Sequence, residues 1–229
     1  MNYFMFKGIN SKEFSGLVVN TLPPITKAPK RVETQQIDGV DGEIITELGY
    51  SAYDKDITIT LMKLKDLDEI MAWLNGEGEL VTSLEPDRVY KARIINEIDY
   101  ERVFSMKSAT ITFRVQPFKY ELDENPVTLT ESGKSVTNNG LETSKPRMTI
   151  IGSGTIELIV NGNKFFSYTF PESETEVVID SEKQDAYLGT ILKNRNMTGE
   201  FPILQSGDNT ITWDGAVTSI VIEPKSRWL

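Results

Sequence analysis

Short runs in which apolar and polar residues alternate one by one constrain this chain more than any other feature. The clearest runs are 57–61 and 109–115, where every second side chain is apolar. Successive side chains of a β-strand point to opposite faces, so each run predicts a strand with one face in a core. The predicted inward-facing side chains are Ile57, Ile59, Leu61, Ile111, Phe113 and Val115.

One window has helical spacing instead. Over about 66–75 the apolar residues recur every three or four positions, and Gly76 and Gly78 follow as a stop. This stripe predicts a short helix with a core-facing side rather than a ligand site. Its apolar members are Leu64, Leu67, Ile70, Met71 and Leu74.

The second half of the chain is predicted to be all strand. Asn161-Gly162 lies between two alternating runs and suits a type I′ turn, which predicts a hairpin. Asp214-Gly215 predicts a second hairpin in the same way. The region 122–140 has little periodicity and predicts a linker leading into the second domain. The predicted fold class is mostly β with one short α-helix, in two β-sandwich domains over residues 1–122 and 123–229.

The 229 residues include no histidine and no cysteine. Nucleophile systems that use an imidazole to move a proton are therefore excluded. Zinc, haem and iron–sulfur sites built on imidazole or thiolate are excluded as well. Carboxylate, lysine or hard-cation chemistry remains, together with the prediction that the chain is not an enzyme.

The net charge is −10, from 24 basic and 34 acidic residues. Such a chain repels phosphate backbones, so sequence-specific or general nucleic-acid binding is not expected. An acidic wall does suit a conduit along which DNA must slide. No basic leader is followed by a long apolar run, and no apolar run approaches the length of a membrane span, so membrane insertion is not expected.

Three short motifs resemble known ligand-binding sequences, but each departs from the pattern that binding requires. Gly133-Lys134-Ser135 resembles the end of a phosphate-binding loop, but Thr128 stands where that loop needs glycine. Gly152-Ser153-Gly154 lacks the third glycine of a dinucleotide fingerprint and predicts a turn. The acids of 38–43 lack the spacing of a calcium loop and predict a hairpin tip. No cofactor, metal or catalytic residue is predicted.

Taken in order, several segments resemble the distal tail protein (Dit) family of siphophages, also called the phage tail component family. The first half contributes an opening strand, a glycine-rich loop after a basic residue, a helix ending in Trp-Leu, and a strand that closes on Gln-Pro. The second half contributes Asn-Asn-Gly, Lys-Pro and a closing tail. These segments are Phe4, Phe6 and Gly8; Arg31 and 37–42; Trp73-Leu74; Tyr90-Lys91-Ala92; 109–117; 138–140; 145–146; 201–204; 207–211; and 224–229.

The resemblance implies a first β-sandwich with a helix and an extended hairpin, and a second, galectin-like β-sandwich. It implies a ring-forming homo-hexamer in the virion tail tip, made in the cytoplasm of the bacterial host. The ring would be a structural hub of the baseplate through which DNA passes. It would join the tail tube protein to the tail-associated lysin or tail fibre protein and to a receptor-binding protein.

Two departures from the family pattern matter. Ile37 and Val40 stand where the family often has proline and arginine. Galectin sugar sites use a histidine, which this chain lacks, so that site is not carried over. The hairpin is predicted to extend to a neighbouring subunit and add strands across the interface. The residues assigned to this inter-subunit hairpin are Asp38, Gly39, Val40, Asp41, Gly42 and Tyr50.

Two other functions stay open at this stage. A jelly-roll-like second domain suits a carbohydrate-binding module for host cell-wall glycans. A hydrolase would need two carboxylates placed across a sugar cleft, and with 34 acidic residues a sequence cannot show whether such a pair exists.

Overall fold

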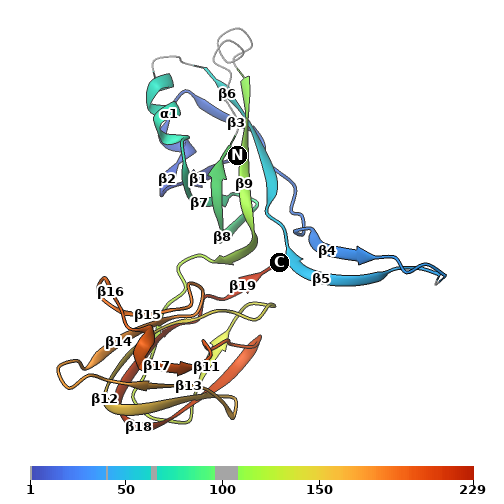
Figure 1. The fold of residues 1–229 in the computed structure, drawn as a ribbon. Coiled ribbons are helices and arrows are strands. Elements are labelled where there is room, and N and C mark those ends of the chain that lie inside the picture. Colours follow the sequence, from blue (N-terminus) through green and yellow to red (C-terminus); the bar gives the residue numbers. More distant parts are fainter. Residues whose placement is uncertain (1, 40, 63–65, 96–107) are drawn as a thin grey trace. The chain divides into compact units, whose positions relative to one another are not determined.

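The structure, a computed structural model, describes residues 2–39, 41–62, 66–95 and 108–229. These residues are mostly in strands, and α1 (Leu67–Trp73) is the one α-helix among them, which confirms the predicted fold class (Figure 1). The chain divides into two compact units, Met1–Leu122 and Asp123–Trp228. No helix in the described ranges is long and apolar enough to cross a membrane.

The first unit is built on one antiparallel sheet with the strand order β2-β1-β7-β8-β9-β6-β3. A short 3-10 helix, Ser11–Glu13, follows β2. A separate two-stranded sheet is formed by β4 (Lys30–Gln35) and β5 (Ile44–Tyr50). The strands of the main sheet are β1 (Phe4–Phe6), β2 (Ile9–Asn10), β3 (Leu17–Thr21), β6 (Tyr53–Leu61), β7 (Glu77–Thr82), β8 (Glu85–Ile94) and β9 (Ser108–Glu121).

The core of this unit lies on one face of β6 and β9. Ile57 faces Ile111 across the ladder, so the two predicted apolar stripes meet side by side. All six side chains predicted to face inward are at most 1% exposed. The period-two pattern therefore identified both strands and the buried face of each.

The helix α1 closes this core over a shorter span than predicted. Asp68 and Glu69 lie in its first turn, where acidic side chains complement the helix dipole. Ile70 and Leu74 are buried, as the stripe predicted, and Gly76 follows with a positive φ of 75°. Leu64 lies outside the described residues.

Trp73 fixes the helix to the sheet. Its ring stacks on Phe4 at 5.2 Å and on Phe14 at 4.9 Å between centroids. Its indole N–H donates a 2.8 Å hydrogen bond to the carbonyl of Phe6. The side chain thus buries a large apolar area while its one polar atom stays satisfied.

The second unit is a larger antiparallel assembly around two long strands, β12 and β18. Its main order is β10-β18-β12-β14-β15-β16, with β11 also beside β18 and β13 joining β12 to β17. A 3-10 turn, Asn194–Asn196, precedes β17. The strands of this sheet are β10 (Val127–Leu129), β11 (Lys134–Asn138), β12 (Arg147–Val160), β13 (Asn163–Thr169), β14 (Glu176–Asp180), β15 (Asp185–Leu188), β16 (Ile191–Leu192), β17 (Met197–Gly199) and β18 (Gly207–Glu223). The short strand β19 (Arg227–Trp228) follows β18 in the chain and is not part of this sheet.

The region 122–140, predicted as a linker, instead holds β10 and β11. Leu129 pairs with Ile220, and Val136 pairs with Asn209, so both strands belong to the sheet. Each strand is only three to five residues long, too short to give a visible alternation. Their partner in the sheet is distant in sequence, which a local pattern does not reveal.

The first hairpin predicted in this unit is confirmed. Asn161 and Gly162 have φ values of 53° and 79° between β12 and β13, as a type I′ turn requires.

The second predicted hairpin is wrong. β18 runs straight through Asp214-Gly215, and β12 likewise runs through Gly152-Ser153-Gly154, where a turn was predicted. At these places the two strands shift register against each other. A Cβ on Gly215, whose φ is 94°, would lie 2.4 Å from the carbonyl oxygen of Thr155. The glycines permit bulges between two close backbones, not turns.

Candidate functional site

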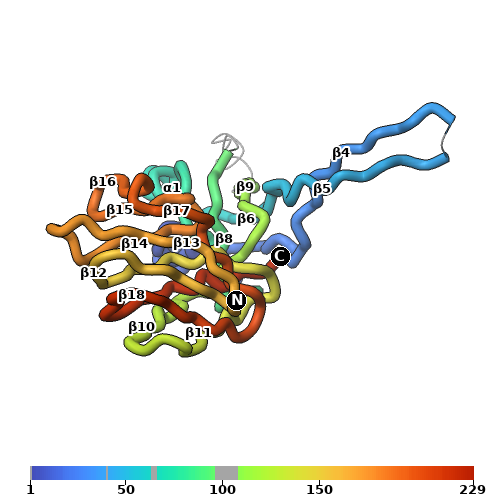
Figure 2. The backbone as a smooth tube through the Cα atoms, turned by 60° about the horizontal axis from the view of Figure 1, so that its bottom comes forward, coloured from blue at the N-terminus to red at the C-terminus, as the bar shows by residue number. Residues whose placement is uncertain are grey.

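The β4–β5 hairpin differs from every other described strand pair in the first unit because it adds nothing to the core. It forms a sheet of its own and projects away from the main sheet (Figures 1 and 2). Every residue of β4 is exposed, and in β5 only Tyr50 is partly covered. An isolated two-stranded sheet is only marginally stable in water. This exposed hairpin therefore adds little to the stability of the unit.

The hairpin carries large apolar side chains on both faces. Opposite residues share a face, and Thr34 pairs with Ile45 while Gln35 pairs with Ile44. Val32 lies on the face of Ile45, so each face has β-branched side chains in water. A concentration of exposed apolar residues on one small element indicates an interaction surface. The exposed fractions are Val32 49%, Ile37 47%, Ile44 53%, Ile45 56% and Leu48 49%.

The structure places most of the predicted site residues at the tip of this hairpin. Asp38 and Gly39 form a turn, and Asp41 and Gly42 lie in a bend one residue before β5. Val40 lies outside the described residues. The four described tip residues are exposed, and a Cβ on Gly39 or Gly42 would meet no atom within 4 Å.

Tyr50 lies at the other end, at the base of the hairpin. Its ring packs edge-on against Phe118 of β9, with 5.7 Å between centroids. Beside it, the backbone N–H of Ser51 donates a 2.8 Å hydrogen bond to the carbonyl of Pro29 and closes the base. Arg31 donates to the carbonyl of Leu48 at 2.8 Å. The structure thus separates Tyr50 from the tip residues with which the sequence grouped it.

A buried polar cluster of the first unit was not predicted from the sequence. Tyr90 donates a 2.6 Å hydrogen bond to Glu85, and Lys119 forms an ion pair with the same carboxylate. Lys55 is only 3% exposed and lies over the ring of Tyr90, with Nζ 4.7 Å from its centroid. The signal in the sequence was Lys55 itself, which occupies the inward-facing position two residues before Ile57.

Burial and charge shift the pKa of each group in this cluster. Burial lowers the pKa of Lys55 and outweighs the attraction of Glu85. Burial opposes ionisation of Glu85, but hydrogen bonds from Lys119 and Tyr90 outweigh it and lower the pKa of Glu85. Burial and the neighbouring Glu85 raise the pKa of Tyr90. Glu85 is therefore ionised and Tyr90 is neutral at pH 7, as a hydrogen-bonded structural network requires.

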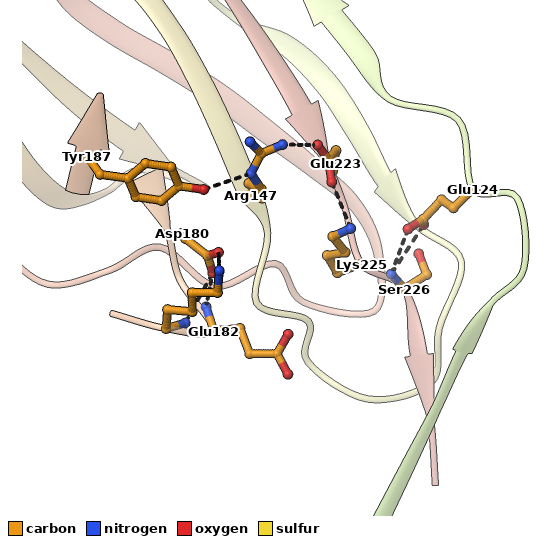
Figure 3. A network of polar contacts seen from close by, with 9 residues as sticks. Glu124, Arg147, Asp180, Glu182, Tyr187, Glu223, Lys225 and Ser226 are labelled. Carbon is orange, nitrogen blue, oxygen red and sulfur yellow. Dashed lines mark hydrogen bonds and ion pairs between the residues drawn. The ribbon is translucent and has the colours of Figure 1, made fainter. Parts of the chain in front are cut away.

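The second unit has a polar network of its own, on the strands β12, β15 and β18 (Figure 3). Arg147 donates to Tyr187 at 3.2 Å and to Glu223 at 2.5 Å, and Lys225 lies 2.7 Å from Glu223. Burial alone would raise the pKa of Glu223, but the hydrogen bonds from Lys225 and Arg147 lower it. The carboxylate of Asp180 accepts hydrogen bonds from two backbone N–H groups of the following turn. Each of these acids is thus engaged within the fold.

Residues 138–140 are one of the segments that carry the family resemblance. The side chain of Asn138 hydrogen-bonds to main-chain groups of several loops. Asn138 is 1% exposed and donates to the carbonyls of Glu142 and Leu204 at 2.9 and 3.3 Å. Its carbonyl oxygen accepts from the N–H of Gly140 at 2.9 Å. The hydrogen bonds of Asn138 thus hold neighbouring loops together. In the described ranges, no group of three or more acidic side chains is arranged to hold a metal ion.

Most of the first unit matches a known domain family. Residues 12–115 match the family model described as the phage tail protein RIFT-related domain. No curated protein sequence matches the chain.

Solved structures share the fold of the entire chain. The Dit protein of phage SPP1 matches with a TM-score of 0.75 and 15% identity, over 100% of both chains. That protein is described as a paradigm of the hub adsorption apparatus in phages that infect Gram-positive bacteria. A chain of the phage p2 baseplate in its activated conformation matches with a TM-score of 0.50 and 10% identity, over 97% of this chain and 98% of that one. Residues 12–115 of the first unit thus match the phage tail protein RIFT-related domain, and the chain shares the fold of the SPP1 Dit protein over its full length, in agreement with the resemblance to the siphophage distal tail protein family.

Proposed function

We propose that this protein is a structural hub of a phage tail tip and has no enzymatic activity. The observation that carries the proposal is the match in fold to the SPP1 Dit protein over the full length of both chains. The phage tail domain in the first unit points to the same part of the virion. A fold alone does not fix a function, so the hairpin provides the second support.

The proposed assembly is a ring of six copies in which each hairpin reaches a neighbouring subunit. A ring closes through heterologous contacts, in which one patch of a copy meets a different patch of the next. The hairpin has the properties of such a patch, because apolar side chains lie exposed on both of its faces. Its tip residues Asp38, Gly39, Asp41 and Gly42, with Val40 between them, would reach the neighbour. Tyr50 would hold the base.

The proposed partners lie above, below and around this ring. The tail tube protein would dock on one side, and the tail-associated lysin or tail fibre protein on the other. The second, galectin-like unit would present protein-binding surface to a receptor-binding protein. DNA would pass through the channel without being held, which the net charge of −10 supports. The protein would be made in the bacterial host cytoplasm and reside in the virion tail tip.

Mass in solution tests the ring. We expect light scattering after size-exclusion chromatography to give six times the 25.8 kDa of one chain. Joining Gln35 to Gly49, which removes residues 36–48, should leave a folded monomer that still unfolds cooperatively on heating. Rings that persist in this variant would overturn the role of the hairpin.

A matched control separates the hairpin from exposed apolar surface in general. Ile191 and Leu192 are 62% and 65% exposed at the short strand β16 of the second unit. The double variant Ile191→Thr, Leu192→Thr should still form rings, whereas Val32→Thr, Ile45→Thr should not. A wild-type chain that stays at 25.8 kDa and binds purified cell-wall polysaccharide would instead favour a carbohydrate-binding module.

A further inference from the structure

A lysine stands in the core-facing row of β6, next to the base of the hairpin. Lys55, Ile57 and Ile59 alternate along the strand, and Lys55 pairs with the fully buried Phe113. A buried ammonium group is costly unless polar atoms surround it. The contacts of the Lys55 ammonium group therefore indicate the structural role of this side chain.

The ammonium group of Lys55 is held by two aromatic rings and one carbonyl. Nζ lies 4.7 Å from the ring centroid of Tyr90 and 5.5 Å from that of Tyr53, within the range of cation–π attraction. It donates a 3.2 Å hydrogen bond to the main-chain carbonyl of Pro24. That carbonyl belongs to the segment 22–29, which leads into β4 without strand pairing.

Tyr53, two residues before Lys55 on the same strand, makes a similar contact. Its hydroxyl group donates a 3.3 Å hydrogen bond to the carbonyl of Thr26, in the same lead-in segment. Both side chains come from β6, which directly follows β5 and so continues the second leg of the hairpin. Two side chains of β6, after the hairpin, thus donate hydrogen bonds to two main-chain carbonyls of the segment 22–29, before the hairpin.

We propose that Lys55 and Tyr53 are positioning residues, which clamp the lead-in segment of β4 and fix the direction of the hairpin before any partner binds. The Glu85–Tyr90–Lys119 network supports the clamp, because the bond from Tyr90 to Glu85 fixes the ring on which Lys55 rests. If the lead-in moved away, the ammonium group would lose its carbonyl while remaining buried. A hairpin held in this way loses less conformational entropy on docking, so assembly would be tighter. This use of the clamp rests on the proposed function, whereas the clamp itself does not.

The distance between two spin labels tests the clamp directly. Because the chain has no cysteine, Thr46→Cys in the hairpin and Glu79→Cys on β7 give two unique labelling sites. Labelled protein diluted into excess unlabelled protein reports the distance within one chain. Pulsed electron spin resonance should give a narrow distribution for the wild-type background and one about twofold broader for Tyr53→Phe and Lys55→Met, since a local anchor is lost.

The variants are chosen so that loss of fold cannot imitate the result. Lys55→Met keeps the side-chain stem and removes a buried charge, so the chain should still fold and unfold in one cooperative thermal transition. Arg114→Met is the control. It removes an exposed ion pair between Arg114 of β9 and Asp54 of β6, and it leaves the hydrogen bonds to the lead-in segment in place. Its distribution should stay narrow.

The outcomes separate the clamp from the ring. Unchanged widths in both Tyr53→Phe and Lys55→Met would overturn the clamp, whatever the state of assembly. A wild-type chain that forms no ring would overturn the proposed hub, while broadening in the variants would still support the clamp.

Discussion

The β4–β5 hairpin and the β12–β18 pair are both antiparallel ladders, but they differ in what lies beside them. In the β12–β18 pair, Ile150 faces Ile220 and both are 0% exposed, whereas in the hairpin Thr34 faces Ile45, which is 56% exposed. The backbone pairing is of the same kind, and the difference is the presence of a core. The long pair contributes to the stability of the fold through buried apolar area, whereas the apolar area of the hairpin is exposed to water in the single chain.

The largest expected difference concerns apolar truncation. Leu158→Ala in β12 removes a 0% exposed side chain and should lower the free energy of unfolding by about 3 kcal/mol. Ile45→Ala in β5 should change it by less than about 0.5 kcal/mol in the monomer, because the side chain is already in water. Urea denaturation of dilute protein followed by circular dichroism measures both. Equal losses would mean that the hairpin has a core of its own, and the comparison would fail.

A glycine pair sharpens the contrast at the level of the backbone. Gly215 in β18 and Gly42 at the hairpin tip have nearly the same φ, 94° and 93°. Gly42→Ala should cost about 1 kcal/mol for the left-handed conformation alone. Gly215→Ala should cost about 3 kcal/mol, because its Cβ would also lie 2.4 Å from the carbonyl oxygen of Thr155. Thermal melts of the two variants side by side give the difference, and similar melting temperatures would count against crowding in β18.

The smallest expected difference concerns ion pairs. Glu223→Gln should lose about 1 kcal/mol of stability at pH 7, because Glu223 is half-buried and pairs with Arg147. Its pKa is lowered in the folded protein, so the stabilisation is present above the unfolded value of about 4.3 and disappears as the pH falls through the folded value. Glu47→Gln, which removes the exposed partner of Lys30, should have no measurable effect.

Denaturation at pH 7 and at pH 3 checks this pair. The gap between wild type and Glu223→Gln should narrow at the lower pH. A gap of the same size at pH 3 would mean that Glu223 stabilises the fold through packing rather than through its charge.

Local periodicity was enough to predict two strands that both show a clear alternation of apolar and polar residues and that pair with each other. Ile57 and Ile111 lie in runs long enough to show which face is buried, and both runs became central strands. Asn161-Gly162 was also predicted correctly, because a type I′ turn depends on the residues of the turn itself.

The errors arose where distant contacts decide the structure. Asp214-Gly215 has the composition of a turn, but the opposing strand β12 holds the backbone extended through it. The short strands β10 and β11 gain their stability from β18, about eighty residues later in the chain. The tip of the hairpin was visible from its acids and glycines, whereas the anchor of its base depends on Lys55 and Pro24, which only the fold brings together.

The position of β18 in the chain has a consequence for biosynthesis. β18 pairs with β10, β11 and β12, and it is nearly the last element to be made. The second unit therefore cannot complete its sheet on the ribosome until translation is almost finished, while the strands β1 to β9 of the first unit are available much earlier. The sheet of each new copy would thus form in two stages. The later stage is exposed to misfolding for the time that the ribosome takes to reach β18.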